Sequence, residues 1–116
     1  MSKHALTAVF SMDPTRKAQL IEQLEPVVIS MVRELPGFVT GFWTWDHTTN
    51  MSYGFIVFET EAHARSLETF LKNSAEDFAQ KGTRLERAAV GEVIGAASGN
   101  AANKVDNANL WKHFGR

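Results

Sequence analysis

Two neighbouring stretches of the chain are apolar on both faces of the strands that they predict, and this feature restricts the fold more than any other. They are Phe38–Asp46 (FVTGFWTWD) and residues 52–60 (SYGFIVFET), with the polar segment 47–51 between them. Their aromatic and β-branched residues predict a β-hairpin with a loop of about five residues. Alternation separates Phe38, Thr40, Phe42 and Thr44 from Val39, Gly41, Trp43 and Trp45, and it separates Gly54, Ile56 and Phe58 from Tyr53, Phe55 and Val57.

The segments around the hairpin predict two helices and two further strands. A strand is expected over residues 5–11, and a helix over about 14–34 that begins at the Asp13 cap and is kinked or split at Pro26. Thr60 can cap a second helix over about 61–80, and residues 85–97 predict the last strand. The order β-α-β-β-α-β predicts the α+β class with a ferredoxin-like, four-stranded antiparallel sheet. We expect one domain over residues 1–97 and a polar tail over 98–116, which ends in a short aromatic anchor or is simply loose.

The apolar residues on the second face of this sheet require a partner. Two helices can cover only one face of a four-stranded sheet. Four large side chains on the other face contribute roughly 5–10 kcal/mol when they are buried, at about 1.5–3 kcal/mol each. The simplest partner is a second copy of the same sheet, related by a two-fold axis. We therefore predict a homodimer, packed sheet to sheet, with Trp43, Trp45, Phe55 and Val57 at its interface.

Two short segments resemble a known family. Pro36-Gly37-Phe38 and Val57-Phe58-Glu59-Thr60-Glu61 are similar to the corresponding segments of the antibiotic biosynthesis monooxygenase (ABM) family, and the resemblance covers residues 5 to about 97. It implies a dimeric α/β barrel with an apolar pocket between sheet and helices. Some members oxygenate polycyclic phenols to quinones without a cofactor, and others degrade haem.

The chain departs from the catalytic patterns of that family. Quinone-forming members carry an Asn and a Trp on the second hairpin strand, at positions that are Gly54 and Phe58 here. Haem-degrading members use an Asn on the first strand and a Trp and a His on the second helix, whereas this first strand has no Asn and this helix has no His after His63. Two interpretations stay open: a cofactor-free, monooxygenase-like protein that binds a small aromatic or apolar molecule, or a non-catalytic dimerisation, ligand-binding or interaction module. Haem binding through a lone histidine is a third.

Two histidines are the candidate catalytic bases. His63 lies in the first turn of the second helix and could take a proton from a phenol in the pocket, although the position also suits a solvated helix face. His47 follows Asp46 in the hairpin loop and could act as a base that this carboxylate orients, or belong to an ordinary polar turn. The candidate ligand-binding residues are Phe42, Thr44, Tyr53, Phe58 and Arg65. A dimer core would explain the aromatic ones without any ligand.

Composition restricts the partners. The 116 residues carry 12 basic and 13 acidic side chains, a net charge of −1, so we expect no nucleic-acid partner. The chain has no cysteine and no pair of histidines at metal-ligand spacing, so we expect neither a metal site nor a resident cofactor. No apolar run is long enough to cross a membrane and the first residues lack a signal sequence, so the expected location is the cytoplasm.

Overall fold

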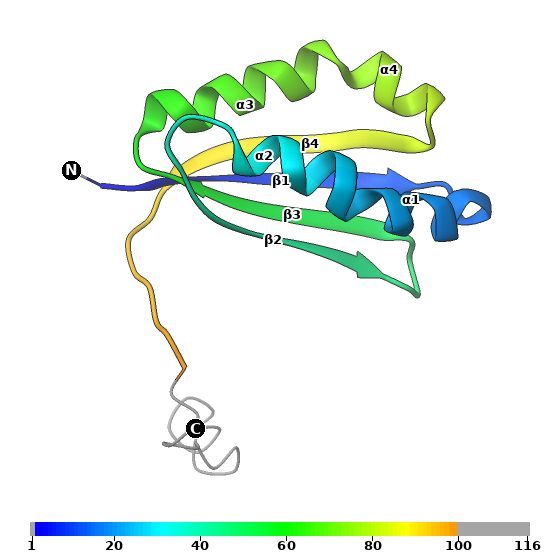
Figure 1. Cartoon of the computed structure of the whole chain (residues 1–116), viewed down its shortest axis with the longest axis horizontal. Coiled ribbons are helices and arrows are strands. Elements are labelled where there is room, and N and C mark those ends of the chain that lie inside the picture. Colours follow the sequence, from blue (N-terminus) through cyan, green and yellow to red (C-terminus); the bar gives the residue numbers. More distant parts are fainter. Residues whose placement is uncertain (1, 100–116) are drawn as a thin grey trace.

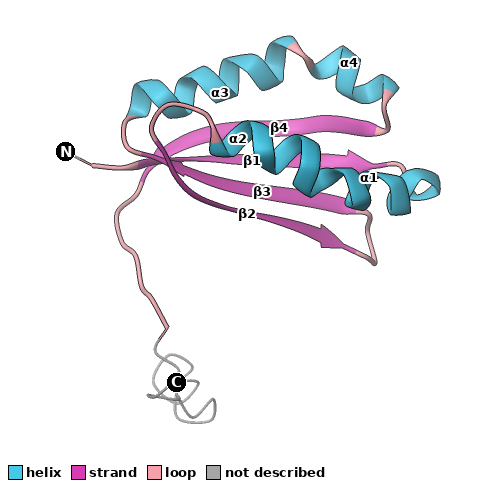
Figure 2. Ribbon diagram, viewed as in Figure 1, coloured by secondary structure: helices cyan, strands magenta, loops and turns pink. Residues whose placement is uncertain are grey.

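Four strands form one antiparallel sheet in the order β2-β3-β1-β4. The computed structural model describes residues 2–99, and its strands are β1 (His4–Met12), β2 (Phe38–Asp46), β3 (Met51–Phe58) and β4 (Thr83–Glu92). Figures 1 and 2 show the helical segments arranged against this sheet. The predicted α+β, ferredoxin-like arrangement is confirmed. The predicted aromatic anchor of the tail lies outside the described residues.

The predicted first helix is present, but its winding changes along its length. It consists of a 3₁₀ turn (Pro14–Arg16), α1 (Lys17–Gln23), a π-helical turn (Leu24–Ile29) and α2 (Ser30–Arg33). Asp13 caps its start, as predicted, by accepting a hydrogen bond from the backbone N–H of Thr15 at 2.9 Å. Pro26 lies in the π-helical turn, because proline lacks an N–H and its ring would clash with the carbonyl four residues earlier in regular α winding.

The second helical segment is seated directly on the sheet. It consists of α3 (Glu61–Asn73) and α4 (Ala75–Gln80). Thr60 caps α3, as predicted, since its Oγ1 accepts a hydrogen bond from the backbone N–H of His63 at 3.2 Å. Ala64, Leu67 and Leu71 form the buried stripe of α3. Among the helices of residues 2–99, none is long and apolar enough to cross a membrane.

The core lies between the helices and one face of the sheet. It is made by Leu6, Ala8, Ile56 and Phe58 of the sheet, Ala64, Leu67 and Leu71 of α3, and Val32 of α2. Within residues 14–33, all of which the structure describes, Val32 is the only buried residue. Ile21, Val28 and Met31, which recur at helical spacing and so would be expected on the buried side of this helix, remain partly exposed. The first helical segment therefore does not close against the sheet as α3 does.

A β-bulge reverses the predicted faces of β2. The register of β2 against β3 shifts between Phe38 and Thr40, which adds one unpaired residue to β2. A shift of one residue moves every later side chain to the opposite face. Phe38 and Trp43 consequently both pack against the core, and Trp45 lies on the same side, with the Nζ atom of Lys17 from α1 5.9 Å from its ring centroid.

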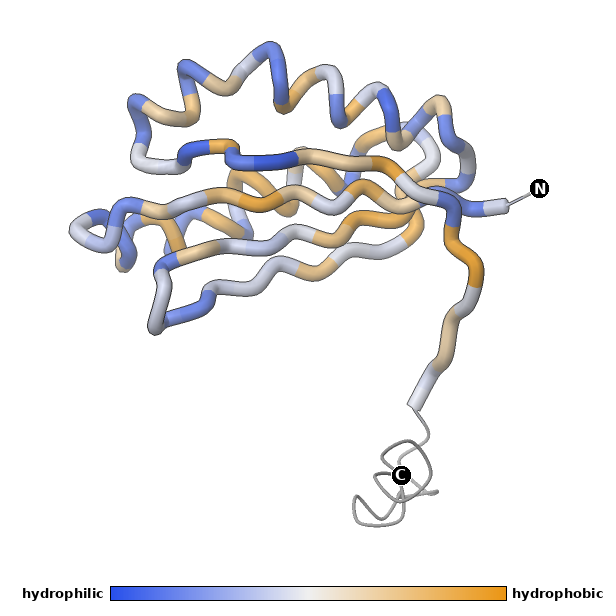
Figure 3. The backbone as a smooth tube through the Cα atoms, turned by 180° about the vertical axis from the view of Figure 1, so that it is seen from behind, coloured by the Kyte–Doolittle hydropathy of each residue, from blue (hydrophilic) through white to orange (hydrophobic). Residues whose placement is uncertain are grey.

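The open face of the sheet carries the other residues of the hairpin. Since Gly54, Ile56 and Phe58 are buried on the helix side, the opposite face holds Phe42, Thr44, Tyr53, Phe55 and Val57. Phe42 is 64% exposed, Phe55 46% and Tyr53 43%, whereas Val57 is buried. The predicted interface that joined Trp43 and Trp45 to Phe55 and Val57 is therefore wrong, because the bulge puts the tryptophans on the opposite face. Figure 3 shows β4 with hydrophilic residues in its first half.

The last strand ends five residues before its predicted end at residue 97, since β4 stops at Glu92. The backbone N–H of Val93 donates to the carbonyl of Lys3 at 2.8 Å, and the chain then leaves the sheet (Figure 1). Ile94 is 94% exposed. The glycines and alanines that follow supply too little side-chain surface to continue the sheet.

Candidate ligand-binding cleft

The space under the first helical segment is an apolar cavity of about 220 Å³. Its walls include Leu24, Val27, Val28 and Met31 of the π-helical turn and α2, Ala8, Trp43, Gly54 and Ile56 of the sheet, and Leu67, Phe70 and Phe78 of α3 and α4. The rings of Phe70 and Phe78 meet edge to face with centroids 6.2 Å apart. Among its lining residues, hydroxyl groups come only from Ser52 and Thr83.

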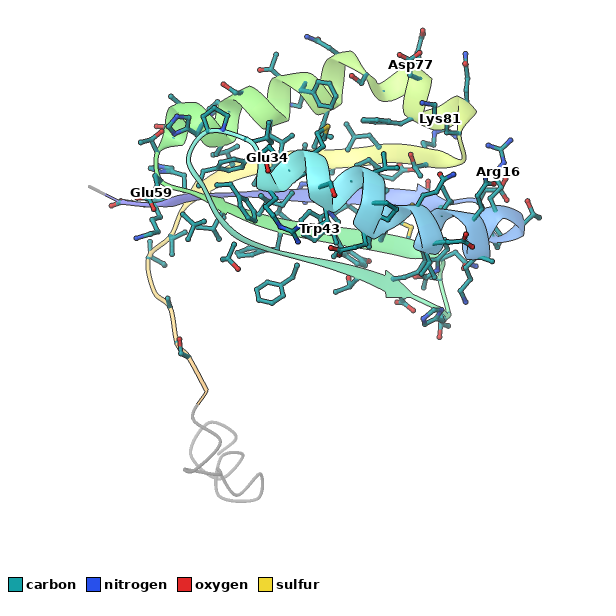
Figure 4. All side chains as sticks on the ribbon, in the orientation of Figure 1. Arg16, Glu34, Trp43, Glu59, Asp77 and Lys81 are labelled. Atoms are coloured by element: carbon teal, nitrogen blue, oxygen red, sulfur yellow. The ribbon has the colours of Figure 1, made fainter. Side chains whose placement is uncertain are left out.

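The indole of Trp43 (Figure 4) is one of the side chains that form the cavity wall on the sheet. Its six-membered ring lies over Gly41, where an added Cβ would come within 3.0 Å of Cη2. Its Nε1 edge lies over Gly54, the residue paired with Trp43 on β3. The two glycines leave the surface of the sheet bare, so the flat ring can rest on it.

A second hollow of about 230 Å³ adjoins the first. The two share Met31, Leu67 and Phe70 as lining residues, so they lie next to each other between α2 and α3, and we refer to them together as the cleft. The second part is the more polar, because His63 and Ser66 line it. Among the residues that line either hollow, His63 alone has a side chain that can act as a base.

His63 is held in position by its neighbours. Its Nδ1 lies 2.8 Å from Thr60 Oγ1, and when this hydroxyl donates to Nδ1 the ring proton of the neutral imidazole is on Nε2. The ring packs against Gly37, which has φ = +79°, and any Cβ at that position would overlap the imidazole. Glycine is therefore required at residue 37 both by the backbone conformation and by the place that the imidazole takes.

The hairpin loop lies outside this cleft. The carboxylate of Asp46 accepts hydrogen bonds from the backbone N–H groups of Thr48 and Thr49, and the bond from Thr48 is the main reason why the pKa of Asp46 lies below its ordinary value. His47 stacks on Trp45 with ring centroids 6.5 Å apart. Within residues 2–99 no hydrogen bond joins the side chains of His47 and Asp46. The predicted catalytic pair in the loop is wrong, because the carboxylate is used to close the turn.

Arg65 and most of the predicted ligand-binding residues also lie elsewhere. Arg65 is on the exposed face of α3, paired with Glu68 at 3.1 Å and Glu61 at 3.2 Å. The hydrogen bond to Glu68 raises the pKa of Arg65 the most, and the hydrogen bond to Glu61 raises it further.

Phe42, Thr44 and Tyr53 lie on the open face of the sheet. The bulge in β2 is the reason why Phe42 and Thr44 lie there. Of the predicted set, only Phe58 lines the cleft, in its second part.

Sequence patterns missed the residues of the first helical segment and Trp43. Leu24, Val28 and Met31 belong to a stripe that normally predicts core packing. Pro26 in the middle of that stripe is the signal that could have indicated a wide turn and a poorly closed helix. Within residues 2–99 no group of three or more His, Asp or Glu side chains is placed to hold a metal ion.

Comparison with known proteins gives similarity in structure alone. No protein-family model and no curated protein sequence matches the chain. Among solved structures, a monooxygenase from the Streptomyces coelicolor gene ActVA-Orf6, in complex with the ligand Nanaomycin D, superposes with a TM-score of 0.60 at 20% identity over 85% of this chain and 94% of its own.

Two further structures agree with it. A Chloroflexus aurantiacus protein described as an antibiotic biosynthesis monooxygenase has a TM-score of 0.58 at 14% identity, over 84% of this chain and 98% of its own. A Nitrosomonas europaea protein of unknown function has a TM-score of 0.60 at 18% identity, over 87% of this chain and 98% of its own. The chain thus has the ferredoxin-like fold of the antibiotic biosynthesis monooxygenase-type structures.

Proposed function

We propose that the cleft binds a small, flat, predominantly apolar molecule and that the protein oxygenates a phenolic one without a cofactor. The observation that carries the proposal is the apolar cavity of about 220 Å³ with an indole on its wall. An engineered apolar cavity of about 150 Å³ holds benzene, so this one suits a molecule of one or two rings. The Streptomyces coelicolor monooxygenase, whose structure contains the ligand Nanaomycin D, supports the binding of a small molecule by this fold.

The proposed reaction converts a phenol and O₂ into a quinone and water. The phenol supplies all four electrons: one oxygen atom of O₂ becomes the new carbonyl oxygen, and the other leaves as water. A phenolate transfers electrons to O₂ more readily than a phenol, so a base must take the phenolic proton first. His63 is the residue of the cleft that can do this, in the tautomer whose Nδ1–H donates to Thr60 Oγ1, because Nε2 then carries no proton and can accept one.

Oxygen uptake with 1-naphthol, whose product would be 1,4-naphthoquinone, tests this proposal. We expect uptake by the wild-type protein, none by His63→Ala, and wild-type uptake by His47→Ala. His47 is the matched control, because it is a histidine outside the cleft. Uptake that persists in His63→Ala would remove this residue from the mechanism, and binding without uptake by the wild-type protein would leave a ligand-binding module.

We also propose that two copies associate through the open face of the sheet. Phe42, Tyr53 and Phe55 support this, since each is an aromatic side chain more than two-fifths exposed on that face. In native mass spectrometry, the wild-type protein should have twice the chain mass and Phe42→Glu should have the single mass. Ile21→Glu is the control, because Ile21 is an exposed apolar residue of α1. A wild-type protein of single mass would refute the dimer.

A further inference from the structure

The second hollow of the cleft keeps apolar surface uncovered. Met31 from α2 and Phe70 from α3 both line it, yet they are 41% and 43% exposed. Leu35, Pro36 and Phe58 add to its apolar lining. Its volume of about 230 Å³ exceeds the roughly 150 Å³ of a cavity that holds benzene, so it has room for a side chain of one or two rings. An apolar side chain that enters the hollow would remove this surface from water.

Two acidic residues, Glu34 and Glu59, lie beside this hollow, and both are labelled in Figure 4. Glu34 directly precedes the lining residue Leu35, and Glu59 directly follows the lining residue Phe58. The backbone N–H of Glu59 donates to the carbonyl of Gly37 at 2.8 Å, which holds Glu59 beside the loop that precedes β2. Both acidic side chains are exposed, and no ion pair among residues 2–99 includes either of them. The hollow therefore favours a partner that carries positive charge next to apolar side chains.

The chain itself contains a segment of that composition. Residues 110–114 read Leu-Trp-Lys-His-Phe, and Arg116 follows them. No acidic residue occurs within residues 107–116, and Val105 is the only large apolar residue of 98–109. This segment lies outside the described residues. Its large apolar side chains and its positive charge complement the hollow in both respects.

The tail begins close to the second hollow. The backbone N–H of Val93 donates to the carbonyl of Lys3 at 2.8 Å. Nε2 of the next residue, His4, lies 4.0 Å from Oε1 of Glu61 in the first turn of α3. His63, in the same turn, lines the hollow. A few residues thus connect the point where the chain leaves the sheet with the hollow.

The length of the tail allows the apolar segment to return to this point. Figure 1 shows the chain leading away from the sheet after β4. The six residues from Val93 to Gly99 can carry it away by at most about 20–22 Å, whereas the eleven residues from Gly99 to Leu110 can span about 36–40 Å. A site within reach on the same chain is met at an effective concentration of the order of millimolar, which favours it over the same site on another copy.

We infer that residues 110–114 dock in the second hollow of their own chain. Trp111 enters the hollow, and the charges of Lys112 and Arg116 lie beside the two flanking carboxylates. The docked segment covers His63 and shields it from water, so it acts as a lid on one side of the cleft. This goes beyond the proposed function, because the lid closes whether or not a small molecule occupies the neighbouring cavity.

The test uses a nitroxide spin label at residue 115, introduced by Gly115→Cys, and the label attaches there alone because the chain has no cysteine. A nitroxide broadens amide resonances, and the effect falls steeply with distance. In the ¹⁵N-labelled full chain, we expect the strongest broadening outside the tail at Leu35, Ser66 and Leu67, which line the hollow. The amide of Thr48, in the hairpin loop outside the cleft, should not be broadened.

Variants with the same label test which side chains hold the segment. Trp111→Ser should lower the ratio of docked to free segment by about tenfold or more, because a large apolar side chain is no longer buried. Val105→Ser is the matched control, since it removes an apolar side chain of the tail outside the docking segment, and it should leave the broadening unchanged. Glu34→Gln and Glu59→Gln should each lower the ratio by about 1.4-fold to fivefold.

Three results would overturn the inference. The first is broadening that is strongest at Phe42 and Phe55, because the segment would then lie on the open face of the sheet. The second is broadening that appears only when spin-labelled chains are mixed with ¹⁵N-labelled chains that carry no spin label, because the hollow of another copy would then hold the segment. The third is broadening that Trp111→Ser leaves unchanged. None of these measurements uses a small molecule or oxygen uptake, so their failure would leave the proposed function standing.

Discussion

Replacing either glycine beneath Trp43 by alanine gives a matched pair of variants with opposite expected effects. A Cβ at residue 41 would lie 3.0 Å from Cη2 and 3.1 Å from Cζ3 of Trp43. Two carbon atoms in ordinary contact are about 3.5–4.0 Å apart, so Gly41→Ala must displace the indole. A Cβ at residue 54 would lie 3.7 Å from Cδ1 and Nε1, so Gly54→Ala need not.

The expected magnitudes follow from two opposing terms. Gly41 and Gly54 are not among the glycines with positive φ, so alanine fits either backbone and stabilises by about 0.4–1 kcal/mol through the unfolded chain. Overpacking against the indole costs about 1–3 kcal/mol, and only Gly41→Ala incurs it. Urea unfolding should therefore show Gly54→Ala more stable than the wild-type protein and Gly41→Ala less stable by roughly 0.5–2 kcal/mol. Equal stabilities of the two variants would refute the position assigned to the indole.

Three other variants test the core, the cap and an ion pair. In urea unfolding, Leu6→Ala should lose about 2–5 kcal/mol because Leu6 is 0% exposed, whereas Val27→Ala, at 59% exposed, should change stability by less than about 0.5 kcal/mol; similar losses would contradict this core. In thermal unfolding, Thr60→Ala should lose about 1 kcal/mol with the cap of α3, and Thr60→Ser should keep most of it; equal losses would argue against the cap. A hydrogen bond from Arg65 is the main reason why the pKa of Glu68 is lowered, so its stabilisation is complete above the ordinary pKa of a glutamate and is lost as the pH falls through the lowered value. The difference in stability between the wild-type protein and Glu68→Gln should narrow from pH 7 to about pH 3, and a constant difference would contradict this reasoning.

Features that depend on neighbours in the sequence were predictable. The caps at Asp13 and Thr60 each join a side chain to a backbone N–H two or three residues later, so the residue type indicates the contact. The hairpin strands could be placed within two residues of their bounds because strong β-formers stop at a polar turn. The order of these elements then determined the ferredoxin-like fold.

The faces of β2 could not be predicted in the same way. A bulge depends on how one strand pairs with its neighbour, and the shift between Phe38 and Thr40 exists only in the register against β3. Strict alternation from Phe38 onward therefore assigned Trp43 to the wrong side. Because of this one unpaired residue, Trp43 lies in the cavity wall and not in the candidate interface, and Phe42 lies on the open face and not in the cavity.

The cavity arises from the same sequence feature that makes the first helical segment pack poorly. Its apolar stripe predicts burial, yet Pro26 lies in a wide π-helical turn and Val32 alone reaches the core, so Val28 and Met31 line open space. A ligand there would cover apolar surface that the fold itself leaves uncovered, and each 100 Å² covered contributes about 2.5 kcal/mol. The ligand would contact both the first helical segment and the sheet, and so would hold the two together. Without a ligand these apolar side chains stay uncovered. A ligand that binds in the cleft should therefore also stabilise residues 17–33 in their folded position.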